Sequence, residues 1–448
     1  MDVSMALGKE PIGKLLWRFS VPAIIGMLVN ALYNVVDSIF VGNGVGEIGL
    51  TAVTIAFPIM LVMMAVGMLI GVGASTLVSL RLGENNKTEA EQILGNALSL
   101  IILCAFIMSG LGLIFLDPIL RALGAEPTVL PYARVFTRII FAGSVFMYIG
   151  FGLNNVIRAE GNPRLAMVTM LISAILNTIL NPIFIFGLKM GIGGSALATV
   201  ISQAVSAVWV LGHFFGRRSV LKIRLKYLRP DLDIARKIAV IGMSPFFMQL
   251  AASIVTVIYN FGLIRYGGDL AVAAMGIVNR VAMLLLMPVF GISQGAQPII
   301  GYNYGAGQYQ RVFQTLKKAI LAASGISLIG FVFVQIFDYH IVRLFNSNPE
   351  LIALGGKGLR IMLILLPVIG FQMTAAQYFQ AVGKAKYALL FTLSRQVLIL
   401  IPMIVILPKF FGLTGIWLAG PTADLISALL TGYFLYRELR ALQQRDVI

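Results

Sequence analysis

Charged residues, cysteine and histidine are all scarce in this sequence. Only 12% of the 448 residues are charged, and the chain has one cysteine, Cys104, and two histidines. A single cysteine excludes an intramolecular disulfide, and so few cysteine and histidine residues cannot form a zinc cluster. A soluble chain of this length would also need far more charged surface. The composition therefore excludes a soluble domain held together by disulfides or zinc.

Nucleotide-binding and catalytic signatures are also missing. The chain has three Gly-Lys pairs, but none has the flanking residues of the pattern G-x-x-x-x-G-K-S/T. That pattern is needed to hold the phosphates of ATP, so we expect no ATP hydrolysis by this chain. No potassium-filter sequence appears either. We predict that the protein is not an enzyme and that it carries no cofactor.

Long apolar runs take the place of charge. Hydrophobic residues make up 59% of the chain, and the mean hydropathy is +0.92. The runs are about 20 to 30 residues long, which suffices to cross a bilayer core of about 30 Å as a helix. We predict an all-α polytopic membrane protein with twelve transmembrane helices. The predicted spans are 14–41, 52–80, 93–116, 131–156, 165–188, 192–215, 236–265, 271–302, 316–338, 357–382, 387–411 and 415–436.

The net charge of +16 has an ordinary explanation in a membrane protein. Basic residues collect in cytoplasmic loops, so a nucleic-acid partner is not expected. With the N-terminus placed inside, 23 of the 34 Lys and Arg residues lie on inside segments and nine on outside segments. The pattern predicts a multi-pass protein of the plasma membrane, or cell inner membrane, with both termini in the cytoplasm.

The two halves of the chain resemble one another at an offset of 222 residues. Matched pairs include Gly46 and Gly268, Gly73 and Gly295, Gly83 and Gly305, and Gly161 and Gly383. Six spans in each half give a parallel repeat, as in transporters that alternate access by rocking one half against the other. We predict two pseudo-symmetric six-helix lobes, 1–215 and 236–448, around a central cavity. A basic cytoplasmic linker, 216–235, would join them.

One carboxylate lies inside the first apolar run. Asn30, Tyr33, Asn34 and Asp37 follow i, i+3, i+4, i+7 spacing, which places them on one helical face. A carboxylate at bilayer depth is costly unless it is paired, hydrated or protonated, and it usually marks an ion or proton site. The stripe predicts the lining of a water-filled cavity, with Asp37 as a coupling residue for Na⁺ or H⁺.

Other polar residues recur in the spans of the N-terminal half. Asn177 and Asn181 are four residues apart in the fifth span, Ser195 and Thr199 are four apart in the sixth, and Asn154 ends the fourth. With Asp37 they supply the hard oxygen donors that suit a small cation. The same residue types also join membrane helices through hydrogen bonds. Both interpretations stay open at this stage.

The C-terminal half differs, because Tyr259 stands at the position that matches Asp37. Arg280 and Arg395 can form ion pairs with Asp424, or they can line the cavity and bind an anionic group. Flexible thioethers suit the walls of promiscuous binding sites. Our candidates for the lining of a substrate cavity are Tyr33, Asn34, Tyr259, Asn260, Gln294, Met283 and Met287.

The chain resembles the MATE (multidrug and toxic compound extrusion) family over essentially its whole length. The resemblance rests on SVPAIIGMLVNALYNVVDSIFVG at 20–42, GVGASTLVSLRLGENN at 71–86, RAEGNPR at 158–164 and GISQGAQPIIGYNYGAGQ at 291–308. It implies an antiporter that uses Na⁺ or H⁺ to export organic, often cationic, small molecules from the cytoplasm. It also implies a cation site formed by Asp37, Asn177, Asn181 and Thr199, with Asn154 in the same polar cluster.

Some relatives in that family have carboxylates in the seventh and tenth spans, which this chain lacks. Coupling is therefore expected in the N-terminal lobe, and the protein is expected to work as a monomer in the bilayer. The alternative function is a flippase for lipid-linked precursors in the wider superfamily. Flippases of that kind tend to have a basic cavity, whereas the arginines of this chain that could face a cavity are limited to Arg280 and Arg395.

Overall fold

The computed structural model of the chain describes residues 3–217 and 219–445. The described residues contain helices and connecting segments and no strand. They divide into two compact units. Unit 1 comprises α1 (Val3–Lys9) and residues 25–246, and unit 2 comprises residues 10–24 and those from 247 onward.

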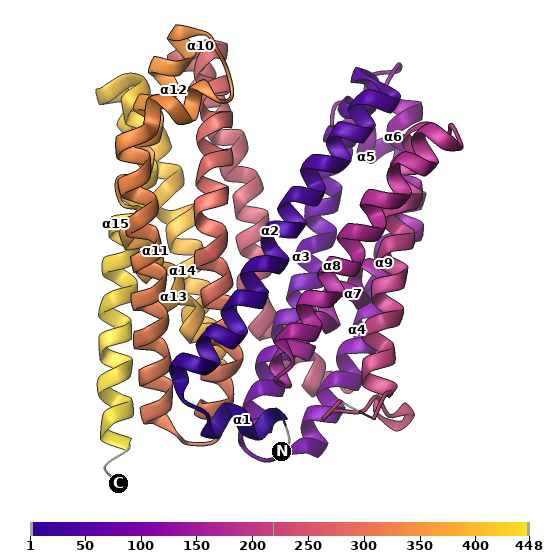
Figure 1. Cartoon of the computed structure of the whole chain (residues 1–448), viewed down its shortest axis with the longest axis vertical. Helices are drawn as coiled ribbons and strands as arrows, with labels where there is room; N and C mark the ends of the chain where they lie inside the picture. Colours follow the sequence, from indigo (N-terminus) through magenta and orange to yellow (C-terminus); the bar gives the residue numbers. More distant parts are fainter. Residues whose placement is uncertain (1–2, 218, 446–448) are drawn as a thin grey trace. The chain divides into compact units, whose positions relative to one another are not determined.

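Most of unit 1 consists of helices that run side by side, in indigo to magenta in Figure 1. Helix α3 packs against α4 and α7, and α8 packs along α9. The elements are α3 (Glu47–Gly83), α4 (Lys87–Ile114), α5 (Leu116–Ala122), α6 (Leu130–Ala142), α7 (Ser144–Ala159), α8 (Pro163–Pro182), the π-helix η1 (Ile183–Gly187), α9 (Gly191–Phe215) and the 3₁₀-helix η2 (Leu225–Tyr227).

Unit 2 has a similar set of helices, in which α11 packs against α12 and α13. The elements are α11 (Tyr309–Arg343), α12 (Pro349–Met362), α13 (Leu366–Ala381), α14 (Ala385–Leu393), the π-helix η3 (Ser394–Leu400) and α15 (Ile401–Arg445). The two remaining helices, α2 (Ile12–Val45) and α10 (Leu232–Gly305), each contribute residues to both units. Helix α2 changes unit after Ile24 and α10 after Phe246, and these two positions are separated by the 222-residue offset.

The structure confirms twelve membrane-spanning segments. Eight helices within the described residues are long and apolar enough to cross a bilayer, and the bent pairs α6–α7 (53°) and α12–α13 (48°) raise the number to ten. Two of the ten each contain two predicted spans. Helix α10 is broken at Gly268 with φ of 64°, and α15 is broken at Gly412 with φ of 55°. Only glycine adopts such angles at little cost, so each break separates two spans.

Backbone geometry repeats at the offset seen in the sequence. Positive φ angles occur at Gly46 and Gly268, at Asn85 and Gly307, and at Gly161 and Gly383. Each pair is 222 residues apart. Both halves of the chain therefore turn at the same points, which supports the internal repeat.

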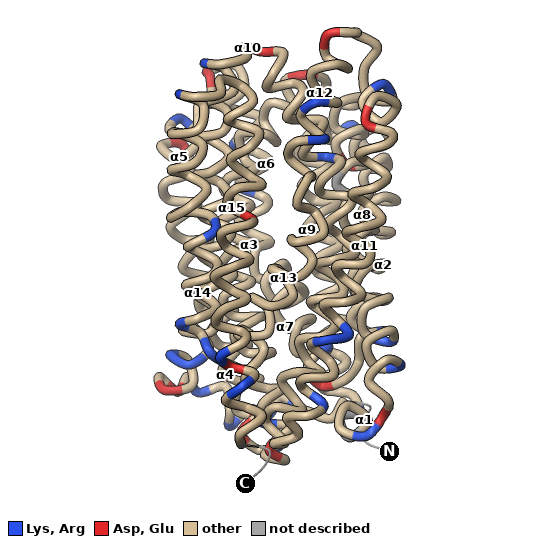
Figure 2. Tube along the Cα trace, turned by 90° about the vertical axis from the view of Figure 1, so that its left-hand side faces the viewer, with Lys and Arg blue, Asp and Glu red and all other residues tan. Residues whose placement is uncertain are grey.

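Lysine and arginine are concentrated near one end of the unit 1 helices, the end at which α4 begins (Figure 2). Local capping explains where that helix starts, because the Asn86 side chain accepts a hydrogen bond from the Glu89 backbone N–H. The predicted linker 216–235 is partly ordered as η2 and as the first turn of α10.

Candidate functional site

Asp37 lies on the part of α2 that belongs to unit 1 and accepts hydrogen bonds from side chains on two other helices. The Asn181 side-chain amide on α8 and the Ser195 hydroxyl on α9 both donate hydrogen bonds to Asp37 Oδ1. The Ser195 contact is 3.2 Å long. Helix α2 and the consecutive helices α8 and α9, which lie far from it in the sequence, therefore meet at one carboxylate.

A second row of polar side chains adjoins this contact. Asn177 Nδ2 donates to Thr199 Oγ1 at 3.0 Å, and Asn181 Nδ2 also approaches Asn177 Oδ1 at 3.4 Å. Tyr33 shares a hydrogen bond with Thr199. The structure thus brings four of the five predicted cation-site residues into one connected network, within which Asn181 links Asp37 to Asn177.

Helix periodicity explains how the network forms. Asn177 and Asn181 share a face of α8, and Ser195 and Thr199 share a face of α9, because each pair is four residues apart. Helices α8 and α9 pack along each other, so the two polar faces meet. Pro182 ends α8 and the π-helix η1 follows at once, which interrupts the regular helix directly beside Asn181.

The site contains buried oxygen atoms that lack a partner. Asn181 is 0% exposed, and its Oδ1 has no hydrogen-bond partner among the described residues. An unsatisfied acceptor in the interior costs free energy unless a cation, proton donor or water occupies it. Carboxylate, amide and hydroxyl oxygens are ligands that suit a small hard cation. The donor set therefore fits Na⁺, and Asp37 alone suffices to take up a proton.

Asn154 has a less direct relation to the network. It is buried on α7, and its Oδ1 also lacks a hydrogen-bond partner among the described residues. Helix α7 packs against both α8 and α9. The residue thus lies in the same helix bundle, but the described contacts do not connect it to Asp37, and its role in cation binding stays a prediction.

The candidates for substrate contact lie in different environments. Tyr33 is half-buried on α2, and the side chain of Asn34 lies outside the described residues. On α10, Asn260 and Met283 are exposed, while Gln294 and Met287 are half-buried. Polar side chains that are exposed on a membrane-spanning helix favour contact with water over contact with lipid.

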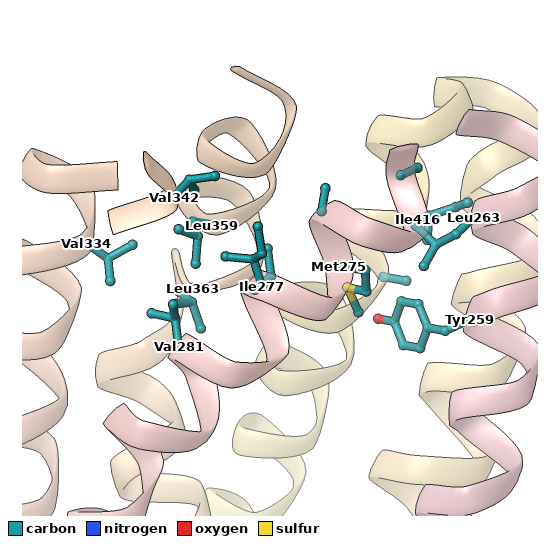
Figure 3. Packing of buried hydrophobic residues seen from close by; sticks show 14 of the residues in the cluster. Tyr259, Leu263, Met275, Ile277, Val281, Val334, Val342, Leu359, Leu363 and Ile416 are labelled. Atoms are coloured by element: carbon teal, nitrogen blue, oxygen red, sulfur yellow. The ribbon is translucent and has the colours of Figure 1, made fainter. Parts of the chain in front are cut away.

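Tyr259, by contrast, is only 7% exposed and lies in an apolar cluster of unit 2. Figure 3 shows its ring beside Met275 within that cluster. The nearby Arg395 and Asp424 form an ion pair, with Arg395 Nη2 at 2.6 Å and Nε at 2.7 Å from Asp424 Oδ1. Arg280 is exposed. The sequence left open whether Arg395 pairs with Asp424 or lines a cavity that binds an anionic group. The structure shows the ion pair with Asp424.

Sequence reasoning noted Ser195 as a polar residue of the sixth span but did not include it among the cation ligands. Its direct hydrogen bond to Asp37 makes it part of the site. The signal was present, because Ser195 precedes Thr199 by one helical turn. Which of the two hydroxyls reaches the carboxylate depends on the rotation of α9, and spacing alone does not specify that rotation.

Comparison with known proteins agrees with this architecture. The model of the MatE family matches the chain twice, at residues 22–183 and 245–406, which together make up well over half of it. The multidrug export protein MepA of Staphylococcus haemolyticus (strain JCSC1435) is 29% identical over 96% of this chain and 94% of its own length.

Solved structures are similar as well. One of them, described as an outward-facing multidrug resistance MATE family transporter of the MOP superfamily, is 26% identical and covers 99% of both chains with a TM-score of 0.93. Another solved chain, described only as protein A, is 41% identical over 96% of both chains with a TM-score of 0.89.

Proposed function

This chain belongs to the MatE family of membrane transporters, and from that premise we propose that it is a cation-coupled antiporter that exports organic compounds from the cytoplasm by alternating access. The observation that carries the proposal is the Asp37 carboxylate, which receives hydrogen bonds from Asn181 and Ser195 within apolar helices. An ionisable group at that depth is expensive to maintain for packing alone.

The coupling ion is Na⁺ or H⁺. Sodium would bind to Asp37 and to the free oxygen of Asn181, with Thr199 and Asn177 in the adjoining row. A proton would need only the Asp37 carboxylate. Either ion neutralises the charge of the half-buried Asp37 carboxylate, and it favours the conformation in which the site binds it more tightly.

The substrates are small organic molecules, most of them cationic or amphipathic. The names of the relatives support this substrate class, because they include a multidrug export protein and a multidrug resistance transporter. Tyr33 in unit 1 offers an aromatic ring, and Met283 and Met287 in unit 2 offer thioethers; both are groups that such molecules favour. The protein would act as a monomer in the plasma membrane, with both termini in the cytoplasm.

The ion pair between Arg395 and Asp424 counts against the flippase alternative. A cavity that binds a pyrophosphate-linked lipid needs arginines whose charge is available to the ligand. Neutralisation of Arg395 by Asp424 leaves Arg280 as the remaining arginine that was predicted to face a cavity. The antiporter is therefore the function that we propose.

Proteoliposomes loaded with ethidium test the proposal and identify the ion. A Na⁺ gradient and a pH gradient are imposed separately, and ethidium movement is followed by fluorescence. We expect one of the two gradients to drive transport and the Asp37→Asn variant to abolish the response. Equal ethidium movement with and without either gradient would contradict coupled export.

A further inference from the structure

The segment between α9 and α10 is packed against other parts of unit 1. Figure 1 shows it beside the lower part of α4. Val220, Leu221 and Ile223 are buried, and the Ser219 hydroxyl donates to Glu160 Oε2 at 2.7 Å. Residues 219–231, predicted to be part of a linker, are therefore packed against the helices of unit 1.

Successive turns of α4 hold this segment. Arg224 Nε lies 2.6 Å from the Glu91 carboxylate. One turn further, a side chain at Gly95 would place its Cβ 2.5 Å from the backbone oxygen of Tyr227, so only glycine permits the contact. The Ser99 hydroxyl donates to the Leu228 carbonyl at 2.6 Å. The contacts at 91, 95 and 99 form one stripe along the helix.

The polar residues of this stripe explain the depth of the contact. Predicted span 93–116 begins two residues before Gly95 and six before Ser99. Measured from the start of that predicted span at 1.5 Å per residue, Gly95 and Ser99 lie about 3 Å and 9 Å along the helix. Backbone at that depth must be hydrogen-bonded. Ser99 satisfies the Leu228 carbonyl, and Asn96 Oδ1 accepts from the Asp231 N–H at 2.6 Å.

The outer side of the segment is both apolar and basic. Leu225 is 83% exposed and Leu232 is 85% exposed. Exposed cations adjoin them in the sequence; these are Arg217, Arg224, Lys226, Arg229, Arg236 and Lys237.

The acidic residues nearby cancel only part of this charge, because they are fewer than the basic ones. Asp233 forms an ion pair with Lys237, and Asp231 accepts hydrogen bonds from the backbone at the start of α10. Hydrogen bonding to Glu91 and its charge raise the pKa of Arg224, so that arginine stays protonated. The segment therefore keeps a net positive charge.

We propose that residues 219–232 form an interfacial anchor that binds anionic phospholipid headgroups through Lys226 and Arg229 and places Leu225 and Leu232 among the first methylenes of the acyl chains. Apolar residues flanked by Lys and Arg are typical of segments that lie in the plane of a membrane interface. Basic residues near an anionic bilayer surface are attracted to it electrostatically. Because α10 begins at Leu232, the anchor connects the first turn of that helix to the surrounding lipid.

The depth of the anchor is tested with a fluorescent label in full-length protein. Leu225→Cys is made in a Cys104→Ala background and labelled with an environment-sensitive fluorophore, and Lys87→Cys is the matched control. Lys87 is exposed at the start of α4, eight residues before Gly95, which is about 12 Å lower along the helix. In bilayers of brominated phospholipid we expect strong quenching at position 225 and little at 87. Equal, water-like signals at both positions would overturn the proposal.

Lipid selectivity is tested in nanodiscs of phosphatidylglycerol and of phosphatidylcholine. We expect the wild-type thermal midpoint to be higher in phosphatidylglycerol, and Lys226→Gln/Arg229→Gln to lose at least half of that difference. Soluble glycerol phosphate should not reproduce the shift, because the leucines need acyl chains. An unchanged difference in the double variant, or full reproduction by glycerol phosphate, would overturn the assignment to anionic lipid. Neither Lys226 nor Arg229 belongs to the Asp37 network. Transport by the double variant in detergent-free vesicles therefore serves as a folding control.

Discussion

Asp37 receives both of its described hydrogen bonds on one oxygen. Asparagine keeps an oxygen at this position but has no charge and cannot exchange a proton at physiological pH. Asp37→Asn should therefore reduce gradient-driven export at least tenfold, to the level of empty liposomes, while the thermal midpoint in detergent changes by only a few degrees. Export and melting are measured on the same preparation.

The matched control for that variant is Asp424→Asn. Asp424 is a second carboxylate within a span; it is buried and paired with Arg395. Its replacement leaves an arginine without its partner, and we expect a loss of about 1–3 kcal/mol in stability, because Arg395 is partly hydrated. If Asp37→Asn melted like Asp424→Asn and still exported drug, the role of Asp37 would be structural.

Asn181 and Asn177 have different relations to the carboxylate. Asn181 touches Asp37 and has a free oxygen, whereas Asn177 bonds to Thr199 and Asn181. Alanine at 181 should thus raise the ion concentration needed for half-maximal transport several-fold more than alanine at 177. Ion titrations of both variants check this. If the two asparagines only join helices through hydrogen bonds, both alanine variants should melt at lower temperature and their ion titrations should be unchanged.

At the scale of elements, each unit contains the same close helix crossing. In unit 1, a Cβ at Gly242 would lie 1.8 Å from the Leu69 carbonyl oxygen, and one at Gly73 would lie 2.1 Å from the Ile238 carbonyl oxygen. In unit 2, Gly291 and Gly295 meet the backbone of Ile24 and Ser20. At the 222-residue offset Gly295 matches Gly73, whereas Gly291 matches Leu69 and Ser20 matches Gly242. Close contacts at glycine therefore join the exchanged ends of α2 and α10 to the two units, with contact pairs that differ between the units.

Substitution of Gly242 tests this crossing. Gly242→Leu should destabilise the protein by about 2 kcal/mol or more, because backbone atoms cannot move aside as a flexible side chain can. The matched control is Gly276→Leu in the same helix, where nothing lies within 4 Å of an added Cβ. Thermal melting of the two variants in detergent should differ clearly. Equal melting temperatures would show that the helices can move apart at Gly242 without loss of stability.

The spans and most residues of the Asp37 network could be predicted from the sequence. Twelve apolar runs of bilayer length predict helices directly, because lipid leaves the backbone few alternatives. The i, i+4 spacing of Asn177 with Asn181 fixes their shared face regardless of what they contact. Local periodicity thus specified which residues lie on one side of each helix.

Contacts between distant segments could not be predicted in the same way. The bond from Ser195 to Asp37 depends on the rotation of α9, and the burial of Tyr259 depends on which helices surround it. Packing of the segment 219–231 against α4 was missed as well, because its basic composition is equally typical of an unattached cytoplasmic loop. Asn96 and Ser99, two polar residues early in an apolar span, were the available signal.

At the scale of the whole molecule, the two halves share a scaffold but not a chemistry. Asp37 matches Tyr259 at the offset, and these residues lie in different surroundings. Asp37 is bonded to amide and hydroxyl groups, whereas Tyr259 is packed among apolar side chains near an ion pair that is already neutral. Ion binding should therefore act on the N-terminal half, while the C-terminal half supplies substrate contacts.

Labels on α2 test this asymmetry. A ligand shifts a conformational equilibrium only by its differential affinity for the two states. Addition of the coupling ion should change the accessibility of a cysteine label on α2 in a Cys104→Ala background. Asp37→Asn should remove that change, because the ion then has no charged group to neutralise. Tyr259→Phe should keep it, because the ring still fills the apolar cluster and the lost hydroxyl does not take part in the Asp37 network. If Tyr259→Phe lost the response and Asp37→Asn kept it, coupling would belong to the C-terminal half, and the carboxylate of α2 would have to be explained by packing.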